Sequence, residues 1–336
     1  HLMRRTFAAL ALAAALFVGA ASAQQVNLLC SPDLAWCEAL GPAFEAATGH
    51  ELEFIRLSSQ DALARIRAEA ASPVFDVWFG GTGDPHLVAA REGLTEFYEP
   101  SNWGEIIQDL KDQVGGTYIP LYAGAIGFVV NEDALAGKPN PAGWRELTDP
   151  MYKGLIAMPD PNSSGTAYTI IATLVQIFGE DEAFEILAGI HQNIAQYTTS
   201  GAAPGQLAGR GEVASAGQLV DDGVKFAEQG FPLTVYAPAE GTGYEIGGLS
   251  LIANGPNREG AIAFIEWALT PEAQMLAASQ GESFQIQSNM NTPVSPLSPR
   301  LENIDLIDYD FDRFGTPSVR DELVGRWTNE IFPQPR

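Results

Sequence analysis

The sequence predicts an α/β fold in which a mostly parallel sheet is flanked by helices. Short apolar runs alternate with amphipathic helical runs from residue 26 to residue 95, and this order is typical of β-α-β units. The chain has 336 residues, of which 46% are hydrophobic and 10% aromatic. This composition supports a large core and excludes a disordered, a collagen-like or a small disulfide-rich protein.

The charge balance excludes two classes of partner. The chain carries 18 Lys and Arg against 42 Asp and Glu, a formal net charge of −24. Nucleic acids and anionic membrane surfaces are polyanions that attract basic proteins, so neither is expected to bind. A small anionic ligand is still compatible with this charge, because local N–H groups can outweigh a distant net charge.

The N-terminal segment predicts export. Arg4 and Arg5 precede an apolar run over residues 7–18, and Ala21-Ser22-Ala23 follows. This is the pattern of a signal peptide, and the apolar run is too short to span a bilayer. We therefore expect residues 1–23 to be removed after Ala23, and a periplasmic protein without direct membrane insertion.

The first elements contain both cysteines. Residues 26–29 predict a strand, and residues 32–47 predict a helix that contains Cys37. Cys30 and Cys37 have the spacing C-x6-C, which is not the C-x-x-C of a redox site. In an exported chain this pair favours a disulfide that joins the strand end to the first turn of the helix.

Two further strand-helix pairs follow. Residues 52–57 predict a strand, and Ser59 is a good N-cap for the helix after it. Residues 74–79 predict a buried strand that runs into the glycine-rich loop 80–85 and a short helix over 86–92. Ligands in such folds lie beyond the carboxyl ends of the strands.

The middle and the end of the chain continue the pattern. Strands are predicted within 119–131 and over 155–158, 232–236 and 246–252, and helices over 167–178, 181–190 and 259–269. The tail after Thr292 is rich in Pro and Asp and is expected on the surface.

Enzyme signatures are missing from the sequence. It contains no G-x-S-x-G, no phosphate-binding G-x-x-x-x-G-K-S/T and no H-E-x-x-H motif. Residues 308–319 resemble a calcium loop, but Arg313 and Val319 replace its glycine and its final glutamate. We expect no catalytic residues, no cofactor and no enzymatic activity. A hydrolase that uses paired carboxylates stays open as an alternative.

Several loops carry groups that bind anions. Residues 162–166 place three hydroxyls at a predicted helix start, and Ser58-Ser59 repeats the arrangement. A helix N-terminus has partial positive charge and free N–H donors, so it can hold phosphate or carboxylate without Lys or Arg. Ser31 and Gly81-Thr82 occupy equivalent places after other strands.

The chain resembles the extracytoplasmic solute-binding proteins of ABC importers, which have the type 2 periplasmic-binding fold. The resemblance covers the whole chain after residue 23, and it is greatest to the group of ferric-ion, sugar-phosphate and phosphonate binders. The residues that carry it are Ala43-Phe44-Glu45-x-x-Thr48-Gly49, Arg65-x-Arg67-Ala68-Glu69, Asp76-Val77-Trp78-Phe79-Gly80-Gly81-Thr82-Gly83-Asp84, Pro159-Asp160-Pro161-x-Ser163-Ser164-Gly165-Thr166, Asn193-Ile194-Ala195-Gln196-Tyr197-Thr198 with Ser200-Gly201, Glu240-Gly241-Thr242-Gly243-Tyr244-Glu245, and Trp267-Ala268-Leu269-Thr270-Pro271-Glu272-Ala273-Gln274.

The resemblance implies two lobes that close on a solute by hinge motion. Lobe 1 would comprise residues 24–121 plus 249–336, and lobe 2 residues 122–248. Each lobe would have a mixed, mostly parallel sheet with helices around it. The partners would be a small-molecule solute and an ABC permease in the inner membrane, and the protein would be a monomer.

The resemblance leaves several ligands open. Ferric binders of this group commonly use an adjacent Tyr pair, which this chain lacks, so iron would need Asp221, Asp222 and Glu240. The sugar-phosphate binders are similar in their Ser-Gly-Thr and Glu-Gly-Thr-Gly loops, but carry a His-Asp pair where this chain has Asp221-Asp222. We expect a phosphorylated or phosphonate solute, with ferric iron as the alternative. The expected ligand-binding residues are Ser31, Ser58, Ser59, Gly81, Thr82, Ser163, Ser164, Gly165, Thr166, Tyr197, Ser200, Asp221, Asp222, Glu240 and Thr242.

Overall fold

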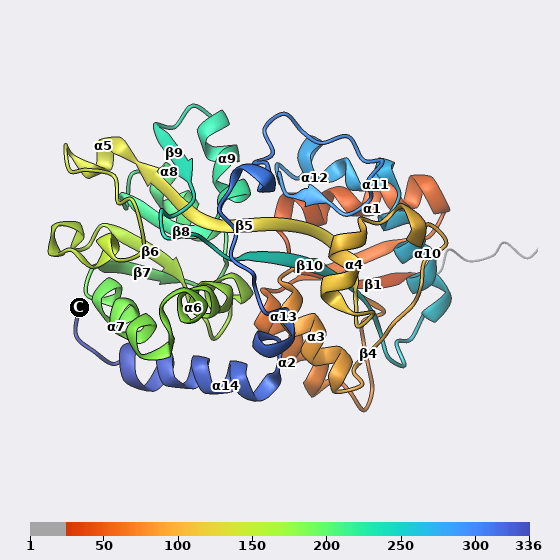
Figure 1. Ribbon diagram of the computed structural model, residues 1–336. Helices are drawn as coiled ribbons and strands as arrows, with labels where there is room; N and C mark the ends of the chain where they lie inside the picture. Colours follow the sequence, from red (N-terminus) through yellow and green to blue (C-terminus); the bar gives the residue numbers. More distant parts are fainter. Residues whose placement is uncertain (1–24) are drawn as a thin grey trace, which may run out of the picture.

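The computed structural model describes residues 25–336 and shows two sheet-centred halves joined by long strands (Figure 1). The strands connect in the order β2-β1-β3-β10-β5-β8-β6-β7, with β4, β9 and β11 attached at the sides. The signal peptide expected over residues 1–23 lies outside the described residues. Within residues 25–336, no helix is long and apolar enough to cross a membrane.

The first half is built on three parallel strands. β1 (Val26–Cys30) lies between β2 (Leu52–Arg56) and β3 (Val77–Phe79). Helices α1 (Leu34–Thr48), α2 (Ser59–Ala68) and α3 (Gly83–Arg91) follow these strands in turn. The predicted order of elements is confirmed, so the ends of three strands and the starts of three helices meet at one edge.

The predicted disulfide is confirmed. Cys30 at the end of β1 and Cys37 in α1 are bonded, with their Cα atoms 6.1 Å apart, and both side chains are fully buried. Since the closed loop is short, the bridge holds α1 against the strand whose end leads into Ser31.

One long strand belongs to both halves. β5 (Ile119–Asn131) pairs antiparallel with β10 (Tyr244–Ile252) up to Ala125, and from Ile126 onwards it pairs with β8 (Ser215–Leu219). The same strand therefore changes its sheet between Ala125 and Ile126. β10 pairs with β3, β4 and the first part of β5, and so belongs to the first sheet along its whole length.

The second half has its own sheet and core. β6 (Ile156–Pro159) lies parallel to both β7 (Ile194–Thr198) and β8, and β9 (Leu233–Tyr236) pairs with β5. Its helices are α6 (Gly165–Phe178), α7 (Glu180–His191), α8 (Ala203–Gly209) and α9 (Val220–Glu228). The α6 helix is buried along most of its length because apolar residues surround it on nearly all faces.

Short elements complete the fold. They are β4 (Thr95–Glu96), α4 (Gln108–Val114), α5 (Glu132–Leu135), α10 (Arg258–Ala268), α11 (Pro271–Gln274), α12 (Leu276–Ser279), β11 (Ile286–Gln287), α13 (Phe311–Phe314), α14 (Pro317–Arg326), a π-helical turn (Trp327–Ile331), and 3-10 turns at Trp103–Glu105, Glu146–Thr148, Pro150–Tyr152 and Leu301–Asn303.

The C-terminal segment packs against the second half of the molecule. Phe314, Leu323 and Trp327 belong to the core of the second half, and Tyr168 on α6 donates a hydrogen bond to the Phe314 carbonyl over 2.6 Å. In Figure 1, α14 runs below α6 and α7. The resemblance to the solute-binding proteins implies that residues 249–336 belong to lobe 1. We propose instead that the segment from about residue 309 belongs with lobe 2, because its apolar side chains are buried there.

Candidate ligand-binding cleft

A cleft lies where the loops after the strands of both halves face each other. The first half contributes the loops after β1, β2 and β3, and the second half contributes those after β6, β7 and β8. In an α/β sheet this is where ligands bind. The residues that line the cleft, which encloses about 50 Å³, are Ser31, Pro32, Asp33, Arg56, Ser58, Ser59, Gly81, Thr82, Tyr122, Ser164, Gly165, Thr166, Ser200, Gly201, Ala202, Leu219, Asp222, Glu245, Ser283 and Gln285.

Three helix N-termini point into the cleft. Ser58, Thr82 and Ser164 are the N-cap residues of α2, α3 and α6, and all three side chains are buried. Ser164 Oγ accepts a hydrogen bond from the Ala167 N–H at 3.4 Å. The free N–H groups and partial positive charge of three helix starts together favour an anion.

Glycines let these helix starts approach each other. A Cβ atom on Gly165 would lie 1.7 Å from Thr82 Oγ1, and one on Gly81 would lie 2.4 Å from Ser59 Oγ. Both positions therefore require glycine for the observed packing. Thr82 Oγ1 is buried and, within residues 25–336, has no hydrogen-bond partner, so it is available to a ligand.

Arg56 supplies a partly buried cation to the same place. Its Nε donates to the Pro32 carbonyl at 3.0 Å, and its Nη1 donates to Ser58 Oγ at 3.1 Å. Burial lowers the pKa of this guanidinium, and the nearby carboxylates of Asp33 and Asp222 partly offset that effect; an Arg keeps its charge at neutral pH in any case. Sequence reasoning missed Arg56, although it is the last residue of β2 and directly precedes the Leu57-Ser58-Ser59 loop.

The opposite side of the cleft carries carboxyl groups. Asp222 lies in the first turn of α9 and accepts a hydrogen bond from Gln285 Nε2 at 3.3 Å. Burial, together with the charge of Asp33, raises the pKa of Asp222 to about 7. Burial raises the pKa of Glu245 well above its ordinary value, and the neighbouring Asp221 and Asp222 add to this.

Two carboxyl oxygens in this region lack a protein partner. Asp221 Oδ2 and Glu245 Oε2 are buried and accept no hydrogen bond from the described residues. Asp221 can approach β5 because a Cβ on Gly124 would lie 2.6 Å from Asp221 Oδ1. Burial raises the pKa of Asp221 well above its ordinary value, and the charge of Asp222 does so further. A raised pKa favours the protonated form, in which a carboxyl group can both donate and accept hydrogen bonds.

Several contacts hold the two halves together across the cleft. Ser58 Oγ donates to the Thr199 carbonyl at 3.2 Å, and the Gln60 N–H donates to the Ser163 carbonyl at 3.1 Å. Lys225 on α9 forms an ion pair with Asp33 at the start of α1. The cleft is thus closed in this structure.

Ten of the fifteen predicted binding residues line the cleft. They are Ser31, Ser58, Ser59, Gly81, Thr82, Ser164, Gly165, Thr166, Ser200 and Asp222. Asp221 lies beside this set through its contact with Gly124, and the Ser163 carbonyl contacts Gln60 at its border.

Three predicted residues lie elsewhere. The Tyr197 hydroxyl is 2.9 Å from His191 Nδ1 and its ring packs on Trp327, while Thr242 Oγ1 donates to the Ile126 carbonyl at 2.8 Å. Glu240 accepts hydrogen bonds from the backbone N–H groups of Trp144 and Arg145 at 3.0 and 3.2 Å. Their side chains are thus engaged in the fold, and binding measurements are needed to test them as ligand residues.

The residues named for ferric iron do not form a common site. Asp222 lines the cleft and Asp221 lies beside it, whereas Glu240 binds the backbone around Trp144. Across residues 25–336, no three His, Cys, Asp or Glu side chains are grouped as metal ligands. The residues that sequence reasoning missed are Arg56, Glu245 and Gln285, and only Glu245 lay within a motif that had been singled out.

Comparisons with known proteins find matches over most of the chain. Residues 79–313 match the family model described as bacterial extracellular solute-binding protein. An uncharacterized protein of Haemophilus influenzae is 39% identical over 95% of both chains, and Iron uptake protein A2 of Synechocystis is 26% identical over 89% of both. The structure of the periplasmic binding protein AfuA from Actinobacillus pleuropneumoniae, solved with fructose-6-phosphate, has a TM-score of 0.90 and 38% identity, covering 93% of this chain and 100% of AfuA.

Proposed function

Because the chain belongs to the family of bacterial extracellular solute-binding proteins, we propose that it captures a small phosphorylated solute and delivers it to the permease of an ABC importer. The family consists of solute-binding transport proteins, so binding without turnover is the activity proposed. Export to the periplasm by the signal peptide 1–23 and a monomeric state are part of the same proposal.

The convergence of three helix N-termini with Arg56 carries this proposal. A phosphate is a compact anion with several acceptor oxygens, and the cleft offers backbone N–H groups, buried hydroxyls and one guanidinium. Hydrogen bonds between a charged group and its partner are about twice as strong as neutral ones. An anionic group at Ser58, Thr82, Ser164 and Thr166 would therefore be recognised despite the net charge of −24.

The carboxyl groups support a hydroxylated second end for the solute. Asp221, Asp222 and Glu245 have pKa values raised by burial, so they can exchange hydrogen bonds with sugar hydroxyls. The unpartnered oxygen of Asp221 is accounted for if the solute supplies a donor there. AfuA was solved with fructose-6-phosphate, a molecule with these two ends, and a sugar phosphate is the ligand class that we propose here.

Calorimetry and thermal shift with a panel of solutes test the proposal. The panel contains fructose-6-phosphate, fructose, inorganic phosphate, 2-aminoethylphosphonate and ferric citrate. We expect a sugar phosphate to raise the melting temperature most, since a ligand of the native state stabilises by mass action. Fructose alone and phosphate alone should bind far more weakly.

Other outcomes would contradict the proposal in distinct ways. A visible charge-transfer band with ferric salts, without any shift from organic phosphates, would indicate an iron carrier. Release of inorganic phosphate from an added sugar phosphate would indicate a hydrolase.

A further inference from the structure

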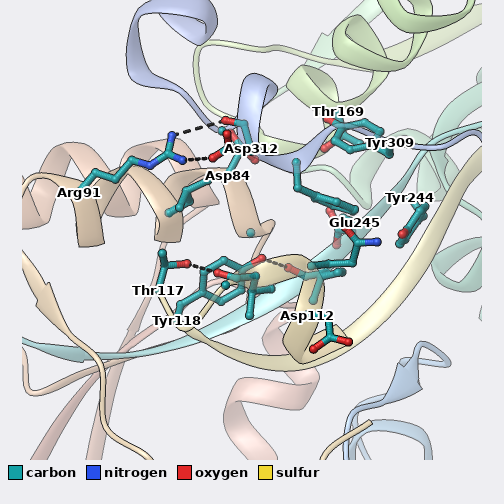
Figure 2. A pocket seen from close by; sticks show the side chains of 18 residues that line it. Asp84, Arg91, Asp112, Thr117, Tyr118, Thr169, Tyr244, Glu245, Tyr309 and Asp312 are labelled. Atoms are coloured by element: carbon teal, nitrogen blue, oxygen red, sulfur yellow. Dashed lines mark hydrogen bonds and ion pairs between the residues drawn. The ribbon is translucent and has the colours of Figure 1, made fainter. Parts of the chain in front are cut away.

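A second cavity, larger than the cleft, adjoins the cleft at Glu245 (Figure 2). It holds about 290 Å³, compared with about 50 Å³ for the cleft. Its walls come from α3, the end of α4 with the following turn, β10, and α6 together with residues 309–315. Both halves of the molecule therefore enclose it.

Aromatic and aliphatic side chains form much of the wall. Figure 2 shows Tyr118 on one side of the cavity and Tyr244 and Tyr309 on the other. The ring centroid of Phe311 lies 5.1 Å from that of Tyr244 and 4.7 Å from that of Tyr309. Aromatic faces attract cations through their quadrupole, and they also pack well against an apolar body.

The charged side chains in the wall are mostly acidic. Asp84, Asp112, Glu245 and Asp312 line the cavity together with a single cation, Arg91. Arg91 is already paired with Asp312. Asp84 has a more distant partner outside the lining, because the Arg320 Nε lies 3.6 Å from its Oδ2. Asp112 is exposed and accepts a hydrogen bond from Gln108 Nε2 at 2.6 Å, but it is not paired with the Arg91 of the wall.

Glu245 is the second observation that points to a ligand. Its side chain is 3% exposed and lines this cavity, and its Oε2 accepts no hydrogen bond from the described part of the chain. An unsatisfied buried carboxyl group costs free energy unless a partner supplies a donor. A cation near it would also favour its ionised form, which burial and the nearby Asp221 and Asp222 now disfavour.

We propose that this cavity is a second binding site, separate from the solute cleft, that takes a small organic cation with an apolar body, such as an aromatic or alkyl amine. The amine would face Glu245 and Asp112, and its apolar part would pack on Leu87, Val114 and Phe311. The site stands independently of the ligand proposed for the cleft, because it shares with the cleft only Glu245.

Three probes of one shape test the site by NMR titration of the full chain: benzylamine, benzyl alcohol and phenylacetate. We expect benzylamine to bind at least threefold more tightly than the alcohol, and phenylacetate to bind more weakly than either. Asp112→Asn should weaken benzylamine at least threefold and leave the alcohol unchanged. Asp109→Asn, in the same helix but outside the lining, is the matched control and should change neither.

A filled cavity gives the second test. Val114→Phe should abolish benzylamine binding while fructose-6-phosphate binding, measured on the same sample, persists. If Val114→Phe does not fold, the comparison of benzylamine binding by Asp112→Asn and Asp109→Asn still tests the proposal. Equal affinity for amine and alcohol, no amine binding at millimolar concentration, or competition between benzylamine and the cleft solute would each overturn the proposal. If the unmodified protein does not bind fructose-6-phosphate, only the proposed function is contradicted.

Discussion

Arg56 in the first half of the molecule donates a hydrogen bond from Nη2 to Ser200 Oγ in the second half, over 3.4 Å. The same nitrogen donates to the Ser31 carbonyl at 3.1 Å, so one guanidinium joins the ends of two strands in the first half to a loop of the second. A solute anion at this point would share the cation that holds the two halves together. Binding and closure are therefore expected to depend on the same side chain.

Replacing Arg56 is predicted to weaken sugar-phosphate binding. Arg56→Met should raise Kd at least tenfold, because hydrogen bonds to charged groups contribute about 1.5–3 kcal/mol. Isothermal titration with fructose-6-phosphate measures the change. Arg67→Met, which removes an exposed arginine paired with Glu92, is the control and should leave Kd within about twofold. An unchanged Kd in Arg56→Met would remove this cation from the anion site.

The hydroxyls at the start of α6 are predicted to contact the anionic group. The double variant Ser164→Ala with Thr166→Ala should weaken solute binding at least tenfold. Ser164 is also an N-cap, whose loss costs about 1 kcal/mol of stability. Thr270→Ala removes an equivalent cap from α11 and should lower the melting temperature without affecting Kd. If the two variants have the same Kd, the Ser164–Thr166 loop does not bind the solute.

The two glutamates of the motif 240–245 are predicted to differ in their effect on solute binding. Glu245→Gln should weaken solute binding severalfold, because it replaces one acceptor oxygen of a buried carboxyl group in the cleft by an NH2 group, which can only donate. Glu240→Gln should leave Kd unchanged and lower the melting temperature, since Glu240 accepts from the Trp144 and Arg145 N–H groups. Titration and thermal denaturation of both variants separate the two roles. Weaker binding in Glu240→Gln together with an unchanged Kd in Glu245→Gln would indicate that Glu240 is the ligand residue.

The stability of the unliganded protein is predicted to fall with rising pH through Asp222. Its pKa is about 7 in the folded chain, against an ordinary value of 3.8 for an aspartate. The unfolded chain therefore loses this proton first, and folding stability decreases between about pH 4 and pH 7. Asp222→Asn removes this contribution and should raise the melting temperature by a few degrees at pH 8, with a smaller gain at pH 4. An equal gain at both pH values would show that Asp222 is ionised in the folded protein.

The disulfide is predicted to stabilise the fold by roughly 2.5 kcal/mol, from the loop-closure entropy of its short loop. Cys30→Ala with Cys37→Ala should lower the melting temperature by several degrees, and dithiothreitol should lower that of the unmodified protein equally. Reduction should also increase the intact mass by two hydrogens. No mass change on reduction would mean that the thiols are free.

The sequence was sufficient to predict the polar loops of the cleft because strand order is local information. Ser31, Ser58 and Thr82 lie one to three residues after the ends of β1, β2 and β3, and parallel strands bring their carboxyl ends to one edge. The N-cap role of Ser164 also depends only on its neighbours in the chain, and the structure confirms that helix start.

The remaining site residues depend on packing that local patterns do not encode. Arg56 ends an apolar strand, and only the approach of Ser200 from the other half reveals its position. Glu245 and Glu240 belong to one motif. However, Glu245 lies on β10, where it pairs with Gly124 of β5, whereas Glu240 precedes β10. The C-terminal segment likewise carries Trp327 to a core built from residues far earlier in the chain.

The shared strand β5 has a consequence for how this protein can be divided or recombined. The chain passes from one core to the other within β5, returns between β9 and β10, and crosses a third time before Phe314. No contiguous stretch of codons therefore specifies one complete core. Expressing a fragment of the gene, or exchanging one half with a homologue, would cut a hydrogen-bonded strand. A chimaera of this protein that exchanges one complete core needs at least three crossover points in the same gene.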